Sequence, residues 1–367
     1  MHKVLTFLVI ASIVGTSGCK DKSIDPLPSE EVGTLYFPPN SGEWLTSSLA
    51  SLEWKESARP KLLELLETGK TRAFVLLKDG KIVIEYYGGK DLLNIADFDQ
   101  TKKWYWASAG KTLTACMVGI ADHDNWLDIN DLTSDYLGLG WTSLTAEQEE
   151  KITVKHQLTM TSGLDDGVAD SHNTSSEYLK FKAAAGSRWA YHNAPYTLLE
   201  QVVAKASKKD FDSYFNEALR DKIGMDGTWS WIDDDHVFFS TARSMARFGL
   251  LMLNNGIWIN DTIVKDRNFF IQMVNTSQTI NPAYGYLWWL NGKDKYMVPG
   301  LQLPINGPIF ADAPSDMVSG LGKNGQYVNV VPSQNIVMIR MGENPDASLV
   351  PIKYNNDLWK VLNEMMN

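Results

Sequence analysis

The sequence is poor in cysteine, and this excludes a fold that depends on disulfide bridges. Only two of its 367 residues, Cys19 and Cys116, are cysteines. Cys19 falls in a predicted export segment, so Cys116 has no partner within the folded chain. Cys116 also lies on the apolar face of a predicted helix, where a free cysteine packs as a small hydrophobic residue. We therefore expect no intrachain disulfide.

The chain also lacks an excess of positive charge. Its 34 Lys and Arg residues are outnumbered by 44 Asp and Glu, which gives a formal net charge of −10. Nucleic-acid binding requires a basic surface, so we expect no nucleic-acid partner. With 44% hydrophobic and 21% charged residues, the composition is that of one large globular domain or two lobes.

No apolar run is long enough to span a bilayer comfortably, but one is typical of an export signal. It extends from Val4 to Val14 behind a basic start and is followed by Thr16-Ser17-Gly18-Cys19. This resembles the lipobox of bacterial lipoproteins; the alternative is an ordinary secretory signal that contains a cysteine. We expect a signal peptide over residues 1–18, lipidation of Cys19 and a polar tether over 19–45. The protein would then be exported, as a periplasmic or outer-membrane-anchored lipoprotein held on the membrane by its lipid.

Strand-like and helix-like runs are segregated along the rest of the chain. Two hairpins are predicted, one from residues 73–77 and 82–87 around Asp-Gly, the other from 326–331 and 336–341. Helical periodicity is found over residues 53–67, 111–121, 198–206, 211–223, 242–253 and 356–366. This arrangement predicts an α+β fold in which both chain ends build an antiparallel sheet flanked by helices.

The folded domain is expected to cover residues 46–367. We assign a sheet lobe to about 46–105 and 256–367, and a mainly helical lobe to about 106–255. The sequence carries no indication of the oligomeric state. We expect no cofactor and no metal ion, since the charged cluster Asp122-His123-Asp124 has no standard zinc spacing and is typical of a helix end. A second charged cluster, Asp233 to His236, is expected to be a loop.

Ser108-Ala109-Gly110-Lys111 is the first stretch with possible chemistry. It stands at the start of a predicted helix, where residues i and i+3 share a face. A serine is a weak nucleophile until a base removes its proton, and a lysine can be that base if burial lowers its pKa. The pattern alone is a weak signal, because Ser17-Gly18-Cys19-Lys20 repeats it inside the export segment.

Three further segments carry or accompany the chemistry that such a serine needs. In Tyr191-His192-Asn193, a phenol beside a buried ammonium would share its proton more easily, and the amide can donate and accept at once. Gly320-Leu321-Gly322-Lys323 leads into the last hairpin, where an edge strand could offer an N–H to an oxyanion. The third, Gln157 to Leu164, is distinctive but has no obvious chemistry.

In this order the segments resemble the motifs of the serine β-lactamase-like superfamily, in the branch of class C β-lactamases, D-Ala-D-Ala carboxypeptidases and esterases. That family shows Ser-x-x-Lys, Leu-Leu-x-His-Thr-Ser-Gly-Leu, Tyr-x-Asn and a Lys/His-x-Gly strand motif. Here Met160 replaces the histidine of the second motif. Residues 239–251 and 284–289 are similar to the 6-aminohexanoate-dimer hydrolase and esterase subgroup. The resemblance covers about residues 70–345 and implies a β-lactamase/transpeptidase-like fold.

The resemblance also implies roles for single residues. Ser108 would be the acylated nucleophile, Lys111 its base and Tyr191 the group that relays protons to the leaving group. Asn193 would orient the substrate or the lysine. The backbone N–H groups of Ser108 and Lys323 would form the oxyanion hole.

Gly320, Leu321 and Gly322 would line the substrate. Gly320 departs from the family pattern, because β-lactamases and carboxypeptidases carry Lys or His there to hold a substrate carboxylate. A neutral small-molecule ester or amide is therefore favoured over a penicillin or a D-Ala-D-Ala peptide. Two alternatives stay open: a D-Ala-D-Ala carboxypeptidase or class C-type β-lactamase, and a non-catalytic binding lipoprotein on the same scaffold.

Overall fold

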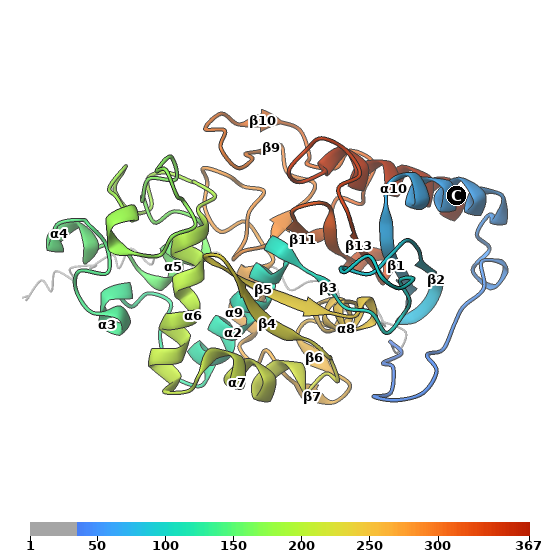
Figure 1. The fold of residues 1–367 in the computed structure, drawn as a ribbon, viewed down its shortest axis with the longest axis horizontal. Coiled ribbons are helices and arrows are strands. Elements are labelled where there is room, and N and C mark those ends of the chain that lie inside the picture. Colours follow the sequence, from blue (N-terminus) through green and yellow to red (C-terminus); the bar gives the residue numbers. More distant parts are fainter. Residues whose placement is uncertain (1–34) are drawn as a thin grey trace, which may run out of the picture. The chain divides into compact units, whose positions relative to one another are not determined.

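The computed structural model describes residues 35–367, so the predicted signal peptide, the lipidation site Cys19 and the first part of the tether lie outside the described residues. The main sheet has six antiparallel strands in the order β2-β1-β13-β12-β11-β8 (Figure 1). Their bounds are β1 Thr71–Lys78, β2 Lys81–Tyr87, β8 Trp289–Leu290, β11 Val318–Gly322, β12 Gln326–Val331 and β13 Ile336–Gly342.

Both predicted hairpins are present, and the sheet joins the two chain ends. The β1–β2 turn has Asp79 at φ 50° and Gly80 at φ 82°, the left-handed pair that suits a two-residue hairpin. β1 then pairs with β13 over its whole length, from Thr71 opposite Gly342 to Lys78 opposite Ile336. This pairing confirms the predicted α+β fold, in which a sheet from both ends encloses a helical middle.

Helices cover both faces of this sheet. On β13 the side chain of Val337 faces α8 (Ala242–Leu253), whose Gly249 comes so close that an added Cβ would lie 2.4 Å from Val337 Cγ1. Met338 points the other way, and its strand partner Asn329 bonds Asn355 of α10 (Ile352–Met366) at 2.8 Å. α1 (Arg59–Thr68) packs beside α10. Because α8 lies on the sheet, it does not belong to the helical lobe to which the sequence assigned it.

The helical part is built around α2 (Lys111–His123) and α6 (Asn193–Ser207), which pack against each other. Shorter helices surround them: α3 Thr133–Leu137, α4 Ala146–Glu149, α5 Val154–Leu158, α7 Phe211–Phe215 and α9 Arg267–Met273. The predicted helix over 211–223 is α7 followed by a π-helical turn, Asn216–Arg220. A small sheet, β3-β5-β4, consists of Trp104–Tyr105, Asp235–Ser240 and Thr228–Ile232.

The β4–β5 hairpin corrects one sequence prediction. We expected a loop at Asp233 to His236, whereas only Asp233 and Asp234 form the turn, and Asp235 and His236 begin β5. Side chains alternate between half-exposed and buried from Asp235 to Ser240, but three aspartates in succession made the start of the strand look like part of a loop. The two remaining small sheets are β6–β7 (Ile257–Trp258, Asp261–Thr262) and β9–β10 (Lys295–Tyr296, Ile305–Asn306).

Residues 35–45, which the sequence assigned to the tether, pack on the domain. The Trp44 side chain is buried, and Arg247 donates hydrogen bonds to the carbonyls of Pro38 and Pro39. The ring of Phe37 lies edge-on to Trp258 at 4.9 Å. The folded part therefore begins before residue 46. Within residues 35–367, no helix combines the length and the apolar character needed to cross a bilayer.

Candidate active site

Ser108 lies in a 3-10 turn, Ala107–Gly110, that leads directly into α2. The residue before it, Ala107, has a φ of 47°. A non-glycine residue in this left-handed region is strained and uncommon, and such strain gathers at functional sites. The turn leaves Ser108 half-buried, whereas Ala109 and Gly110 are buried. The sequence thus located the serine at the start of the helix, as the structure has it.

Lys111 begins α2 and points back to the serine. Its Nζ lies 3.0 Å from Ser108 Oγ, and the side chain is only 3% exposed. Burial lowers the pKa of Lys111 to about 7, although the negative charges of Asp235 and Glu200 oppose the shift. A large fraction of this lysine is therefore uncharged near neutral pH, and an uncharged amine at this distance can accept the serine proton.

Tyr191 completes the group from the turn before α6. The Lys111 Nζ lies 5.2 Å from the ring centroid of Tyr191 and 3.8 Å from that of Tyr196. Burial raises the pKa of Tyr191 well above its usual value of 10, and a polar contact with Ser108 offsets this only in part. We expected the ammonium to ease ionisation of the phenol; instead burial keeps Tyr191 protonated, as suits a proton donor.

Aromatic packing holds the Tyr191 ring in place. It stacks on Trp289 at 5.8 Å with an interplanar angle of 21°, and Tyr284 meets it edge-on at 6.3 Å. Trp189 contacts all three rings. The family-like segment around Trp289 therefore supplies one wall behind the phenol, which restricts the ring to one orientation.

The segment Gln157 to Leu164 has a structural role that its sequence did not disclose. The Met160 carbonyl accepts the N–H of Ala190 at 2.9 Å, just before Tyr191. On the other side, Gln157 Nε2 donates to the carbonyl of Pro195 at 2.7 Å. The segment therefore fixes the backbone on both sides of Tyr191. Met160, which replaces a family histidine, takes part through its backbone at a φ of 57°.

Strand β11 brings the glycine motif against the turn that carries Ser108. A Cβ on Gly322 would lie 2.4 Å from the Trp106 carbonyl and 3.2 Å from the Ala109 nitrogen. A Cβ on Gly320 would lie 3.1 Å from Thr112 Cγ2. Only glycine permits this approach at Gly322. β11 therefore lies directly against the turn that carries Ser108, and Lys323 is the next residue along the chain.

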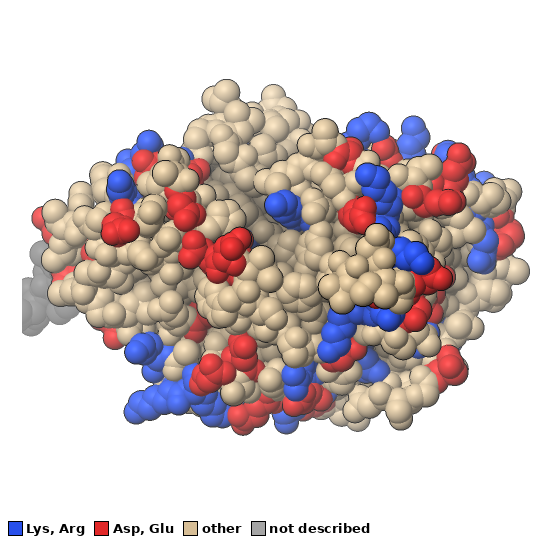
Figure 2. Space-filling view, viewed as in Figure 1, with Lys and Arg blue, Asp and Glu red and all other residues tan. Residues whose placement is uncertain are grey.

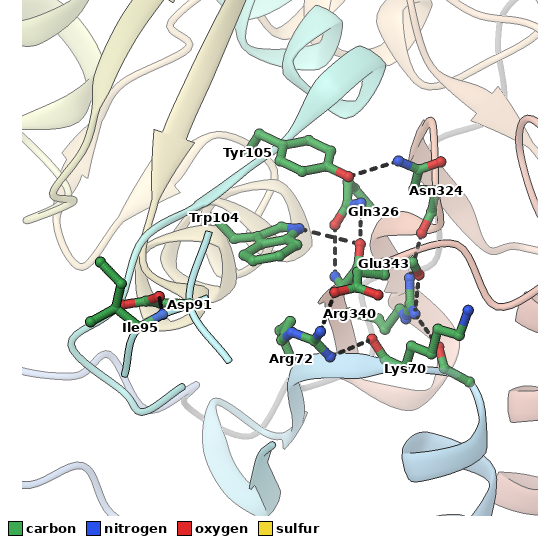
Figure 3. Close-up of polar contacts among 12 residues, drawn as sticks. Lys70, Arg72, Asp91, Ile95, Trp104, Tyr105, Asn324, Gln326, Arg340 and Glu343 are labelled. Carbon is green, nitrogen blue, oxygen red and sulfur yellow. Dashed lines mark hydrogen bonds and ion pairs between the residues drawn. The ribbon is translucent and has the colours of Figure 1, made fainter. Parts of the chain in front are cut away.

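A polar network behind the site fixes the turn after β11 (Figure 3). Gln326 Nε2 donates to the Lys323 carbonyl at 3.1 Å. Asn324 Nδ2 donates to the Tyr105 hydroxyl at 2.8 Å. Arg340 donates to the Asn324 and Gly325 carbonyls at 2.6 and 2.8 Å. The Lys323 backbone is therefore held before any substrate arrives, which is the condition for electrostatic stabilisation of an oxyanion.

Asn193 is bonded away from the lysine. Its Nδ2 lies 2.9 Å from His172 Nε2, and His172 Nδ1 lies 2.7 Å from Asp235 Oδ1. Burial works to raise the pKa of Asp235, but the His172 bond and the charges of Lys111 and Lys323 bring it below its usual value. The structure thus brings Ser108, Lys111 and Tyr191 together, and links Asn193 to His172 and Asp235, to which the sequence analysis gave no role.

The site opens on one face of the molecule. The space-filling surface is hollowed between α6 and β11, and acidic side chains gather on one wall of the hollow (Figure 2). The exposed Lys323 and the half-buried Tyr191 and Asn193 have access to solvent. A small molecule can therefore approach Ser108, while Lys111 stays beneath the surface.

Glu200 and His236 are two more titratable residues that the sequence analysis missed. Glu200 interrupts the apolar run Leu198 to Val203 on α6, and a charge in an apolar helix face is the one signal that could have found it. His236 Nδ1 lies 2.7 Å from Glu200 Oε2, and both side chains are buried. No pattern in the sequence marks His236, because its partner is on another element.

Comparison with known proteins gives one family model that matches most of the chain, and relatives of low sequence identity. The sequence model of the Beta-lactamase family matches residues 69–346. The chain is 26% identical over 164 residues to a protein of Escherichia coli (strain K12) named Beta-lactamase, an alignment that spans 43% of this chain and 42% of that relative's length.

Solved structures share the fold at low identity. A Bacillus anthracis protein named as a 6-aminohexanoate-dimer hydrolase has a TM-score of 0.65 and 18% identity, covering 90% of this chain and 89% of its own. A penicillin-binding protein homolog from Caulobacter crescentus has a TM-score of 0.64 and 11% identity, covering 83% and 97%. These neighbours confirm the β-lactamase/transpeptidase-like fold. The family match covers most of the chain, which therefore belongs to the Beta-lactamase family.

Proposed function

We propose that this protein is a serine hydrolase that forms an acyl-enzyme on Ser108. The observation that carries the proposal is the 3.0 Å contact between Ser108 Oγ and a buried Lys111 whose pKa is lowered to about 7. A lysine that only stabilised the fold would gain from a carboxylate partner. Within residues 35–367, none lies at ion-pair distance from Lys111.

The geometry supports the following sequence of steps. Uncharged Lys111 takes the proton of Ser108 as Oγ bonds to the substrate carbonyl carbon. The carbonyl oxygen becomes an oxyanion, which the N–H groups of Ser108 and Lys323 stabilise; one such donor typically contributes about 10²–10³ in kcat. The bond to the leaving group then breaks, and that group receives a proton from Tyr191, which is replaced by the proton that Lys111 took from Ser108. Water finally adds to the acyl carbon, which releases the carboxylic acid and returns a proton to Ser108 Oγ.

The substrate we favour is a neutral carboxylic ester or amide. β-Lactamases and carboxypeptidases carry a cationic side chain at the position of Gly320. In this chain a Cβ added to Gly320 would lie close to Thr112 and to the Ala109 carbonyl. The strand therefore offers no side-chain charge to a substrate carboxylate there. The runner-up is a β-lactamase or D-Ala-D-Ala carboxypeptidase, which the name of the Escherichia coli relative favours.

Acylation of Ser108 is tested by mixing the protein with p-nitrophenyl acetate and with a fluorescent penicillin. We expect a burst of nitrophenol and an acyl adduct on the peptide that contains Ser108, both absent from Ser108→Ala. Ser213→Ala, an exposed serine on α7, is the matched control and should behave as the parent. Undiminished turnover by Ser108→Ala would overturn the proposal. Labelling by penicillin in preference to the ester would favour the runner-up.

We also propose that the protein is an exported lipoprotein anchored through Cys19. The apolar run from Val4 to Val14 and the following Gly18-Cys19 support this. Metabolic labelling with a fatty acid should mark the parent and not Cys19→Ala. An unlabelled parent that is still secreted would point instead to an ordinary signal peptide.

A further inference from the structure

A carboxylate lies buried behind the proposed base. Glu200 sits on the face of α6 that meets α2, one helical turn after Tyr196, and is 4% exposed. An ionised carboxylate is costly to bury unless it is bonded. The sequence around it is apolar, so Glu200 is not explained by solvation of the helix surface.

Two side chains hold this carboxylate. His236 Nδ1 approaches Glu200 Oε2 at 2.7 Å, and Thr114 Oγ1 donates to Oε1 at 3.5 Å. His236 is itself fixed between two indoles, at 4.5 Å from the ring of Trp231 and 5.1 Å from that of Trp229. The Glu200 oxygens therefore have one position in the folded protein.

That position lies one turn deeper than the base on both helices. Thr114 follows Lys111 by three residues on α2, and Glu200 follows Tyr196 by four on α6, so each pair shares a helix face. The Lys111 Nζ lies 3.0 Å from Ser108 Oγ and 3.8 Å from the Tyr196 ring centroid. Contacts therefore lead from Ser108 to Lys111 and on to Tyr196, and Glu200 follows Tyr196 by one helical turn.

We propose that Glu200 is a positioning residue for the acylation step: with His236 holding it, its buried carboxylate stabilises the ammonium that forms on Lys111 when Ser108 loses its proton. This inference rests on the function proposed above. An ammonium in a buried site lacks the water that would solvate it, and the face of Tyr196 together with a fixed anion replaces part of that solvation.

Other groups around Lys111 have to be counted beside Glu200. Ser108 faces it from the 3-10 turn, Tyr191 and Tyr196 from the α6 region, and Asp235 from β5. Burial is the largest influence on the pKa of Lys111 and lowers it; Asp235 and Glu200 both raise it. Burial raises the pKa of Glu200, and the bond and charge of His236 oppose this. Burial lowers the pKa of His236, but the bond and charge of Glu200 together with the charges of Asp212 and Asp210 raise it overall, so His236 can carry a charge opposite Glu200.

The test is the pH dependence of acylation in Glu200→Gln, which keeps the shape and removes the charge. Acylation requires uncharged Lys111, so its rate rises with pH through the pKa of that lysine. Without Glu200 we expect this rise to move to lower pH by about half a unit to one unit, because a nearby anion favours the ammonium. The plateau rate should fall about three- to tenfold, because Lys111 becomes a weaker base.

Controls separate charge from structure. Glu200→Asp keeps the charge and should retain the parental pH profile, and Asp212→Asn, which removes the half-exposed carboxylate 3.6 Å from His236 Nε2, should do the same. If Glu200→Gln does not fold, the double variant Glu200→Gln with His236→Gln leaves neither buried charge and should show the same shift.

The outcomes also distinguish the two proposals. The rate is measured with a fluorophosphonate that labels Ser108, after the parent has been shown to label and Ser108→Ala not to. Absence of labelling in the parent defeats the proposed function. Normal labelling in the parent, with an unmoved pH profile in a folded Glu200→Gln, overturns the role of Glu200 and leaves the proposed function standing.

Discussion

Two buried basic residues, Lys111 and Arg340, differ in how many hydrogen-bond partners this fold gives them. Lys111 is 3% exposed and Arg340 is not exposed at all, and no carboxylate of residues 35–367 lies within ion-pair distance of either. Arg340 uses all five of its N–H donors within the structure. Its acceptors are Thr71 Oγ1 and the carbonyls of Gly69, Asn324, Gly325 and Glu343. Lys111 has one hydrogen-bond partner among the same residues, the Ser108 oxygen.

The difference shows how one fold makes one cation structural and another reactive. Carbonyl dipoles replace the water that Arg340 loses, and a guanidinium does not release its proton in proteins, so this charge is permanent. Around Lys111 the faces of Tyr191 and Tyr196 replace only part of the lost water, and the pKa falls to about 7. Incomplete compensation is what leaves this amine able to accept a proton.

The largest effect is expected when Lys111 is replaced by arginine, the residue type of the other buried cation. Lys111→Arg keeps a positive charge near Ser108, but the guanidinium cannot act as a base. We expect the rate at which a fluorophosphonate labels Ser108 to fall by about 10³-fold or more, as when a nucleophile loses its base. The measurement is the labelling rate at pH 8.

Lys360→Arg, on the exposed side of α10, is the matched control and should label as the parent does. The circular dichroism of Lys111→Arg should show a folded protein. Labelling within tenfold of the parent would mean that a fixed charge suffices beside Ser108, and that the contrast between the two cations does not explain reactivity.

The same contrast marks what the sequence could predict. The Ser108 and Lys111 spacing lies within one helical turn, and the hairpins around β1 and β13 follow from alternation within each strand, so local pattern identified them. Arg340 sits in the otherwise apolar run of β13, and its acceptors come from carbonyls about 270 residues away at Gly69 and 15 or 16 residues away at Gly325 and Asn324.

Partners that meet only through the tertiary fold could not be read in this way. His172 and Asp235 reach Asn193 from a loop and from β5, and His236 reaches Glu200 from the same strand. A backbone hydrogen bond does not depend on the type of side chain, so the role of Met160 at the Tyr191 turn could not be predicted either. The sequence therefore located the groups that we propose react, but not the residues that hold them.

The second largest effect is on stability, and it should have opposite directions at the two cations. Arg340→Met removes the Arg340 donor from four carbonyls, those of Gly69 and Gly325 in buried bonds, and is expected to cost about 3–5 kcal/mol of unfolding free energy. Lys111→Met removes a poorly solvated amine and should be neutral or stabilise by up to about 1 kcal/mol, because active sites commonly trade stability for function. Urea unfolding measures both. A Lys111→Met protein as unstable as Arg340→Met would show that both cations are structural.

A third effect is the pH dependence of the unfolding free energy, to which we expect Lys111 but not Arg340 to contribute. The pKa of Lys111 is about 7 in the folded protein against 10.5 for a free lysine. Between these values the unfolded chain binds one proton more than the folded one, so stability should rise with pH, by at most about 1.4 kcal/mol per unit. The contribution is the difference in unfolding free energy between the parent and Lys111→Met, measured from about pH 7.5 to 9.5. A difference that stays constant or changes in the other direction would mean that Lys111 stays charged.

The smallest effect is expected where the regions of the two cations meet, at the turn after β11. Tyr105→Phe removes the hydroxyl that accepts from Asn324 Nδ2 at 2.8 Å and leaves the Arg340 bonds to the same turn intact. The loss should be about 1 kcal/mol of stability, the usual net value of one hydrogen bond. If the turn positions the Lys323 N–H for an oxyanion, the acylation rate should also fall, by less than tenfold, because Gln326 still holds the Lys323 carbonyl.

Tyr296→Phe on β9 is the control for the loss of a phenol elsewhere. A larger loss of rate than of stability would show that the network of the structural cation serves the reactive one, whereas a loss of stability alone would make the two regions independent.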